Sequence, residues 1–168
     1  MELKDKIDII RKLIPELNYK KIEVLRIILN SKLEDSIYEK VGLKPVIFLR
    51  SMCKEFNIPI SKLFEKRGNE KVVMLKQFLS FYLYYRFSLT EYEIGALLNR
   101  DRCTILYHIK SAEDLLDSKY WMMVDYNKKA EELIDYLYNI YESKDEEKIN
   151  KFINDLNNYE NEVQITKN

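Results

Sequence analysis

The stretch NRDRCTILYHIK, residues 99–110, brings together three cations, a cysteine, a tyrosine and the only histidine of the chain. Arginine pairs with guanine through two hydrogen bonds, and a small soft side chain such as cysteine fits against a thymine methyl group. His108 falls near the edge of an apolar helical face, with no acid–base partner to make it a catalyst. The side chains therefore favour nucleic-acid recognition, and we expect neither an enzyme nor a bound cofactor.

Cysteine and histidine usage also argues against a metal centre. Cys53 and Cys103 are the only cysteines, they lie fifty positions apart, and a single histidine accompanies them. That set contains no recognisable zinc site. No apolar run approaches the ~18 residues of a membrane span, and the charged first residues do not resemble a secretory signal. We therefore expect reduced thiols and a cytoplasmic protein that does not enter a membrane.

Charge is distributed unevenly along the 168 residues, although the whole chain has a net charge of zero. Residues 43–110 hold twelve Lys and Arg against six Asp and Glu, whereas residues 111–168 hold seven against fourteen. A basic centre of net charge +6 beside an acidic tail of −7 is the asymmetry expected when one region meets a polyanion. Abundant Lys, Asn, Ile and Tyr fit an AT-rich genome such as that of a phage or mobile element, and we expect the protein in the cytoplasm of a bacterial or phage-infected host cell.

Local signals predict the two helices that position the opening stretch. Thr90 precedes Glu93 by three residues, which is the spacing of a capping box at a helix start. Asn99 tolerates the left-handed conformation that ends a helix. Asp101 is then placed to cap the next helix, which runs from Arg102 to about 116. The backbone N–H groups near Thr90 are expected to be available to a DNA phosphate.

Three further positions predict that the two helices form a helix-turn-helix. Gly95 supplies the tiny residue needed where the helices touch, Asn99 the positive φ of the turn, and Ile105 the branched side chain that enters the core. A helical wheel puts one set of residues on the inner face: Ile105, Ile109, Ala112 and Leu116. It puts another set on the outer face, with Arg100 close to it: Cys103, Tyr107, Lys110 and Asp114. Leu106 is assigned to the scaffold.

Helical patterns extend through the remaining chain, and only three glycines and three prolines interrupt them. Stripes of spacing three and four predict helices at 3–17, broken by Pro15, and at 22–33, 126–140 and 149–163. Pro45 suits a helix start and Asn57 its end; Ser61 should cap a short helix. A polar loop around Gly68 then precedes a long central helix at 72–87, and residues 143–148 form a solvated hinge.

At this point residues 43–116 resemble the C-terminal DNA-binding domain of the bacterial replication initiator DnaA. The family motif is Arg-Asp-His-Ser/Thr-Thr-Val-Leu/Ile-His after an Ile-Gly helix; here EIG (93–95) is followed by RDRCTILY (100–107). FNIPISKLFEKR (56–67) resembles the family's short helix and basic loop, and Lys76-Gln77 its Arg-Gln. Nothing matches the family's ATPase module, because no Gly-rich loop is followed by Lys-Ser/Thr.

The resemblance implies that the second helix reads the major groove while the basic loop enters an adjacent minor groove. It places one set of residues on the reading helix: Arg100, Asp101, Arg102, Cys103, Thr104 and Tyr107. It places another on the basic loop: Lys66, Arg67 and Lys71. Arg102, Cys103 and Tyr107 differ from the family motif, at positions that would set sequence preference.

We therefore expect an all-α protein with a helix-turn-helix domain resembling those of Trp repressor and DnaA, at 43–118. Helical extensions at 1–42 and 119–168 flank it; they either pack on the domain or form a seam with a second copy or a protein partner. The expected function is sequence-specific binding of double-stranded DNA, as a transcription regulator or a replication or genome-maintenance accessory. The alternative is a protein-interaction or phage virion-structural module built on the same scaffold.

Overall fold

The computed structural model describes residues 41–165, and this part of the chain is helical throughout, with no strand. Its seven helices are α3 (Pro45–Glu55), α4 (Ile60–Phe64), α5 (Glu70–Arg86), α6 (Glu91–Leu98), α7 (Arg102–Asp117), α8 (Trp121–Glu142) and α9 (Glu146–Ile165). The all-α expectation is confirmed. The helices predicted at 3–17 and 22–33, with the break at Pro15, lie outside the described residues. Within the described part, no helix is long and apolar enough to cross a membrane.

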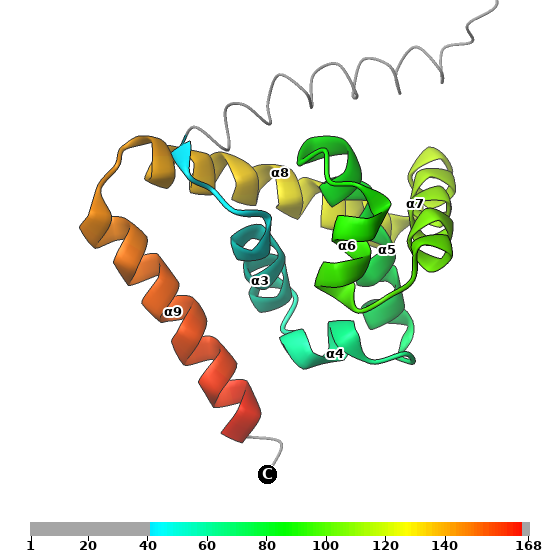
Figure 1. Ribbon diagram of the computed structural model, residues 1–168, viewed down its shortest axis with the longest axis horizontal. Coiled ribbons are helices and arrows are strands. Elements are labelled where there is room, and N and C mark those ends of the chain that lie inside the picture. The colour runs from blue at the N-terminus through cyan, green and yellow to red at the C-terminus, as the bar shows by residue number, and fades with distance from the viewer. Residues whose placement is uncertain (1–40, 166–168) are drawn as a thin grey trace, which may run out of the picture.

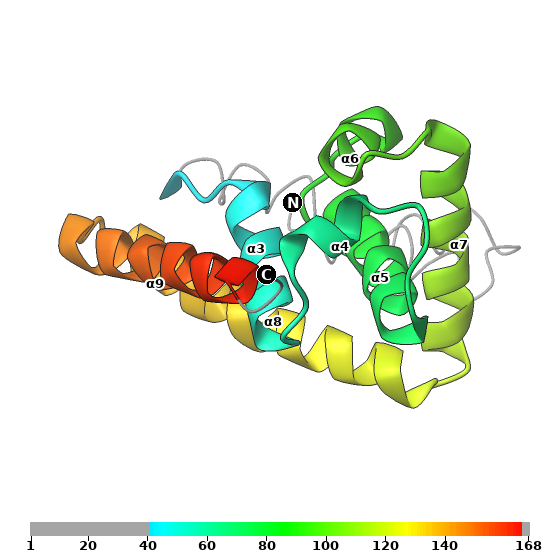
Figure 2. The same ribbon diagram turned by 90° about the horizontal axis from the view of Figure 1, so that it is seen from below.

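Helix α5 lies within the group formed by α4, α6, α7 and α8, and α3 packs against it through Phe48 (Figures 1 and 2). Its apolar residues are buried on several sides, with Phe78, Leu79 and Leu83 completely enclosed. The ring of Tyr82 stacks on Phe48 of α3 with centroids 4.8 Å apart. A helix that buries apolar residues all round is held by its neighbours on every side. The sequence expectation of a central helix is therefore confirmed, although α5 begins at Glu70 rather than 72, because the Asn69 side chain accepts a hydrogen bond from the Val72 N–H.

The two C-terminal helices pack on the same core instead of standing apart. The apolar stripe of α8 is buried, and the Tyr126 hydroxyl donates to the carbonyl of Lys71 over 2.9 Å. One hydrophobic core runs from Leu43 to Leu156, continuous across the expected boundary after residue 118. The stripe of α8 is thus used within the chain, not as a seam between copies.

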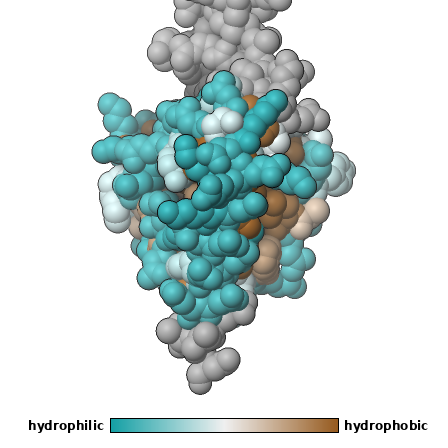
Figure 3. Space-filling view, turned by 90° about the vertical axis from the view of Figure 1, so that its left-hand side faces the viewer, coloured by the Kyte–Doolittle hydropathy of each residue, from teal (hydrophilic) through white to brown (hydrophobic). Residues whose placement is uncertain are grey.

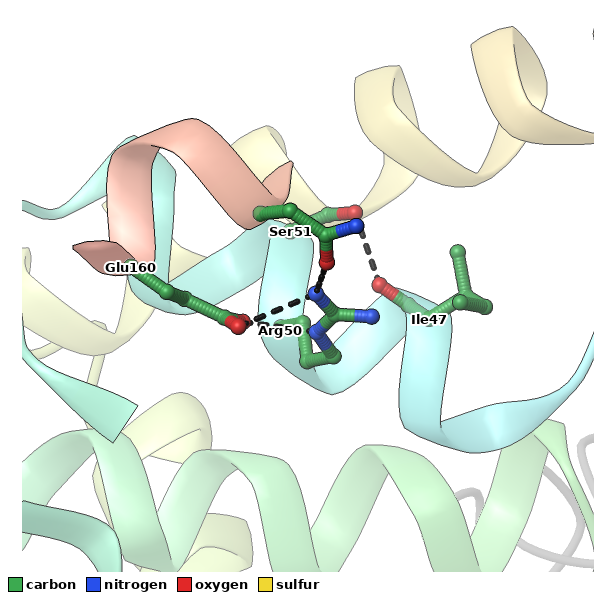
Figure 4. A network of polar contacts seen from close by, with 5 residues as sticks. Ile47, Arg50, Ser51 and Glu160 are labelled. Carbon is green, nitrogen blue, oxygen red and sulfur yellow. Dashed lines mark hydrogen bonds and ion pairs between the residues drawn. The ribbon is translucent and has the colours of Figure 1, made fainter. Parts of the chain in front are cut away.

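Helix α9 is fastened to α3 by a polar cluster. Arg50 Nε donates to Glu160 Oε1 over 2.6 Å, and its Nη2 donates to Glu160 Oε2 over 3.0 Å and to Asn157 Oδ1 over 2.7 Å. Figure 4 shows Arg50 of α3 directed toward Glu160 of α9. Most of α9 outside this cluster and the buried Leu156 is exposed or half-buried. Figure 3, which views the molecule from the α9 side, shows a mainly hydrophilic face with one hydrophobic area.

Five of the six junctions between these helices use a non-glycine residue with positive φ. They are Asn57, Ser88, Asn99, Lys119 and Lys144, with φ between 46° and 55°. This conformation ends a helix and turns the chain, and asparagine accepts it more readily than most residues. The expected roles of Asn57 and Asn99 as helix terminators are confirmed.

Two local predictions need correction. Ser61 does not cap α4, because that helix already begins at Ile60 with Pro59 as its N-cap. The hinge expected at 143–148 shrinks to three residues, because α8 continues to Glu142 and α9 begins at Glu146. Asp145 shortens it by accepting a hydrogen bond from the Lys148 N–H, in the manner of an N-cap.

Candidate nucleic-acid interface

The first helix of the candidate site, α6, begins with the capping box that the sequence predicts. The Thr90 hydroxyl oxygen accepts from the Glu93 N–H over 3.2 Å, and the Glu93 carboxylate accepts from the Thr90 N–H over 2.7 Å. The Thr90 hydroxyl also donates to the Glu93 carboxylate over 2.9 Å, and the two hydrogen bonds that this carboxylate accepts from Thr90 lower the pKa of Glu93. Thr90 therefore has a task within the chain. Glu91 and Glu93 both lie in this first turn. A DNA phosphate approaching the N–H groups near Thr90 would therefore meet two carboxylates.

The turn between α6 and α7 requires the glycine at its inner corner. Asn99 adopts φ 52°, and the Arg100 N–H donates to the Gly95 carbonyl over 2.9 Å. A Cβ atom on Gly95 would lie 2.5 Å from the carbonyl oxygen of Arg100 and 3.8 Å from the Ile105 side chain. A side chain at position 95 is thus excluded by the backbone of the turn, more than by the contact with α7.

Asp101 is the N-cap of α7, as expected, and it occupies both of its carboxylate oxygens there. One oxygen accepts from the Thr104 N–H over 2.9 Å and the other from the Thr104 hydroxyl over 2.8 Å. The bonds from Thr104 lower the pKa of Asp101. Asp101 and Thr104 are therefore committed to each other in this structure and stiffen the leading end of α7.

Helix α7 turns one face to α5 and leaves the other in solvent. Ile105, Ile109 and Ala112 are buried, while Leu116 is half-buried. The outer face is exposed along its N-terminal half: Arg102, Cys103, Leu106, Tyr107 and Lys110. The assignment of Leu106 to the scaffold was wrong, because it is exposed, with 37% of the residue accessible. Tyr107 is 66% exposed, so its ring and hydroxyl are available to a partner.

The two cations on this outer face have weak partners within the chain. The Arg102 guanidinium lies 3.9 Å from the Glu91 carboxylate and over the ring of Tyr92. Lys110 pairs with Asp114, four residues later, over 3.0 Å. Exposed pairs of this kind contribute only about 0–1 kcal/mol. Both cations are therefore free to exchange these partners for a polyanion.

Two predicted DNA contacts have structural tasks within the chain. Arg100 is half-buried, and its Nη1 donates to the carbonyls of Phe64 and Asn99 over 3.2 and 2.7 Å. The expectation that Arg100 points outward with no structural task was wrong, because its guanidinium reaches the end of α4 and donates to the Phe64 carbonyl. Lys71 does not lie on the basic loop; it belongs to the first turn of α5, and its ammonium donates to the carbonyl of Phe56 at the end of α3 over 2.5 Å.

The basic loop and the turn meet at a surface hollow. Lys66 and Arg67 are exposed on the loop and form no ion pair within the described residues. The hollow has a volume of about 520 Å³, with Lys66 on one side and the α6–α7 turn on the other. Its walls come from these residues: Lys66, Gly95, Ala96, Asn99, Arg100, Asp101 and Thr104. The fold thus places Lys66 beside Arg100, Asp101 and Thr104, which are at least 34 positions away in sequence.

Sequence reasoning missed the cation behind this hollow. Lys76 of α5 is only 3% exposed, and its ammonium donates to the carbonyl of Glu65 over 2.5 Å. Burial, followed by the charge of Arg100, lowers the pKa of Lys76. Its position between Leu75 and Phe78, in a helix that buries all its faces, is the one local signal, since a lysine there cannot reach solvent freely.

His108 is buried as expected, with 8% of it accessible, beside Ser80 of α5. Burial, then the charges of Arg100 and Lys76, lower the pKa of His108 to about 4. The imidazole is therefore neutral near pH 7. The Ser80 hydroxyl donates to the Lys76 carbonyl over 2.8 Å, so its oxygen is left to accept from Nδ1 of His108, 3.4 Å away. Such a histidine packs the α5–α7 interface.

Comparisons of the chain with protein-family models, with curated proteins and with solved structures found no match. Residues 41–165 contain no cluster of His, Cys, Asp and Glu that could hold a metal ion. The function must therefore be argued from the surfaces that the fold presents.

Proposed function

We propose that the chain binds double-stranded DNA through α6, the turn and α7, as a transcription regulator or as an accessory in replication or genome maintenance. The observation that carries the proposal is that α7 has one buried face and one exposed face. Its inner face is fixed against α5, whereas Arg102, Cys103, Tyr107 and Lys110 stand in solvent along its N-terminal half. A recognition helix contacts base edges mainly through residues near its N-terminus.

The rigidity of the turn supports this role. Asp101 caps α7, Asn99 ends α6, and Gly95 allows the turn backbone to approach within contact distance. A helix held in this way offers its outer side chains in a fixed arrangement, which reading of base edges requires. The resemblance to the DnaA DNA-binding domain implies the same use of α7 as the helix that reads base edges. It also implies that Lys66 and Arg67 of the loop lie near a neighbouring groove.

The distribution of charge favours this orientation. The helices rich in acidic residues, α8 and α9, extend away from the outer face of α7, and α9 lies on the opposite side of the molecule (Figures 1 and 2). A polyanion approaching α7 therefore meets the basic centre first, while the acidic helices point elsewhere.

The test is the replacement of Arg102 by alanine. We expect specific binding of duplex DNA to weaken by about 1–3 kcal/mol and sequence preference to relax at one position, because a bidentate base contact is lost. Binding is measured by titration at a stated, constant salt concentration, on a site selected from random duplexes with the wild-type protein.

Lys151→Ala is the matched control, because it removes an exposed cation from α9, remote from α7. It should leave specific affinity unchanged. Equal affinities for wild type and Arg102→Ala would rule out direct readout by this residue.

One observation favours a second candidate, a protein-interaction or virion-structural module. The outer surface of α6 and α7 exposes Tyr92, Leu106 and Tyr107 as well as its cations. Exposed aromatic residues are typical of protein–protein contacts. This candidate predicts that no duplex is enriched from a random pool, and that Tyr107→Ala abolishes association with a protein partner while Arg102→Ala does not.

A further inference from the structure

Two cations at the end of α4 form hydrogen bonds to backbone carbonyls and no ion pair within the described residues. Arg100 and Lys76 hold consecutive backbone carbonyls, those of Phe64 and Glu65, over 3.2 and 2.5 Å. No carboxylate of the described residues forms an ion pair with either. In addition, Nη2 of Arg100 is enclosed and has no hydrogen-bond acceptor among those residues.

This arrangement leaves positive charge uncompensated in a poorly solvated place. Carbonyl dipoles satisfy some donors but carry no net charge, and a charge taken out of water costs free energy unless an opposite charge accompanies it. His108 lies close enough for both cations to lower its pKa, and neither gains compensation from its neutral ring. Glu65 is the carboxylate whose charge favours protonated Lys76, and it forms an ion pair with Lys62 instead, so the cluster of Lys76 and Arg100 keeps an excess of positive charge.

The adjoining hollow gives access to that cluster. Arg100 forms part of its wall, and the exposed Lys66 faces it from the loop. Asp101 also lines the hollow and opposes an anion, but both of its oxygens already accept hydrogen bonds from Thr104. The Thr104 hydroxyl donates to Asp101, Nη1 of Arg100 already donates to two carbonyls, and its Nη2 is enclosed. The donor left for a ligand is therefore the Lys66 ammonium, and Arg100 contributes its positive charge from the wall. With Lys76 behind the wall, the formal charge around the hollow is positive.

We infer that this hollow binds a phosphate group between Lys66 and Arg100. The volume of about 520 Å³ accepts a phosphate with its attached sugars, since sites for small molecules occupy roughly 300–1,000 Å³. The inference rests on the proposed function for the source of the phosphate, which is the DNA strand that passes between the loop and the leading end of α7. That strand separates the groove read by α7 from the groove beside the loop.

The first experiment tests the anion site without DNA. Inorganic phosphate is added to the full chain at constant pH and constant ionic strength, with chloride as the reference anion, and the thermal midpoint is measured. We expect phosphate to raise the midpoint of the wild type, since a ligand that binds only the folded state stabilises it. The rise should disappear in Lys66→Gln and in Arg100→Gln, and persist in the control Lys151→Gln.

Lys66→Gln is the decisive variant, because Lys66 forms no hydrogen bond or ion pair with the described residues and its loss should not disturb folding. At the second position, Arg100→Gln removes the charge and also the hydrogen bonds to two carbonyls. Arg100→Lys is therefore added as a variant that keeps the charge. An equal rise in wild type and Lys66→Gln would overturn the site.

The second experiment identifies the source of the phosphate. Duplex affinity is measured over a range of salt concentrations for wild type, Lys66→Gln and Lys151→Gln. Loss of one phosphate contact should reduce the slope of log affinity against log salt by about 0.9 in Lys66→Gln alone.

The two experiments separate the site from the function. A phosphate response with no binding to any duplex supports the anion site and refutes DNA as the source. A phosphate response with duplex binding of unchanged slope supports the site but assigns it to a free anion. Duplex binding without any effect of Lys66→Gln in either experiment refutes the site and leaves the proposed function standing.

Discussion

His108 is the residue whose protonation should be visible in the stability of the whole fold. In the folded chain its pKa falls to about 4, chiefly because it is buried and then because Arg100 and Lys76 lie near it. In the unfolded chain the ring regains its ordinary pKa of about 6.5. Between these values the unfolded state binds a proton that the folded state does not. Lowering the pH through this window therefore favours unfolding.

We predict that the free energy of unfolding decreases as the pH falls from about 6.5 to about 4, with a contribution from His108 of up to about 3 kcal/mol. Above about pH 6.5 this contribution is fully present. The measurement is chemical denaturation of wild type and His108→Gln across that range, since the difference between the two curves removes the titration of carboxylates common to both. Parallel curves would contradict the assignment.

For single residues, the sequence predicts a hydrogen-bond partner that lies a few positions away. It does not predict a partner that is distant in the sequence. Thr90 with Glu93, and Asp101 with Thr104, interact over three positions, so spacing alone identifies them. Arg100 donates to a carbonyl 36 positions away and Lys71 to one 15 positions away. Which carbonyl a long cation reaches depends on how the helices pack, and that information is not local.

Among the elements, α6 shows packing overriding helix propensity. Replacing a glycine inside a helix with alanine ordinarily stabilises the helix by about 1 kcal/mol. At position 95 the new methyl group would lie 2.5 Å from the carbonyl oxygen of Arg100, which belongs to the turn backbone and cannot rotate away.

We therefore predict that Gly95→Ala destabilises the protein, by about 1–3 kcal/mol, as overpacking commonly does. Urea denaturation provides the measurement. Ala96→Gly is the matched control in the same helix: Ala96 is exposed, so only propensity changes, and a loss of about 0.5–1 kcal/mol is expected. A Gly95→Ala variant more stable than wild type would show that the turn relaxes at little cost.

The order and limits of the helices were largely predictable, because capping residues and apolar periodicity are properties of short segments. Pro45 marks the start of α3, and the stripe in α8 gives that helix its buried side. The attachment of α9 was not predictable. It depends on Arg50 meeting Glu160, 110 positions later, and no pattern within α9 identifies its partner.

For the molecule as a whole, the two cysteines report on opposite environments. Cys103 is exposed on the outer face of α7, whereas Cys53 is buried, and burial with the nearby charge of Glu160 raises its pKa to about 12. Only Cys103 should therefore react with an alkylating reagent at neutral pH, because the thiolate is the reactive form and must be reached by the reagent.

Duplex DNA at about ten times its dissociation constant should slow alkylation of Cys103 about tenfold, since only unbound protein reacts. A cysteine introduced on α9, in the double variant Cys103→Ser with Lys151→Cys, should react at the same rate with and without DNA. Mass spectrometry of the modified peptides measures both rates. Protection of the α9 position in place of Cys103 would mean that the molecule binds DNA with its other side.

The five helix junctions with positive φ have a consequence for how this fold can diverge. Most exposed positions tolerate many residue types, but a β-branched side chain at a left-handed position is strongly disfavoured. The backbone thus restricts natural variation at five positions, whatever the surface of the protein binds: Asn57, Ser88, Asn99, Lys119 and Lys144. Descendants of the same ancestor should avoid β-branched residues at these junctions and often carry asparagine or glycine there. The spacing of the junctions would then mark kinship after the surface residues had changed.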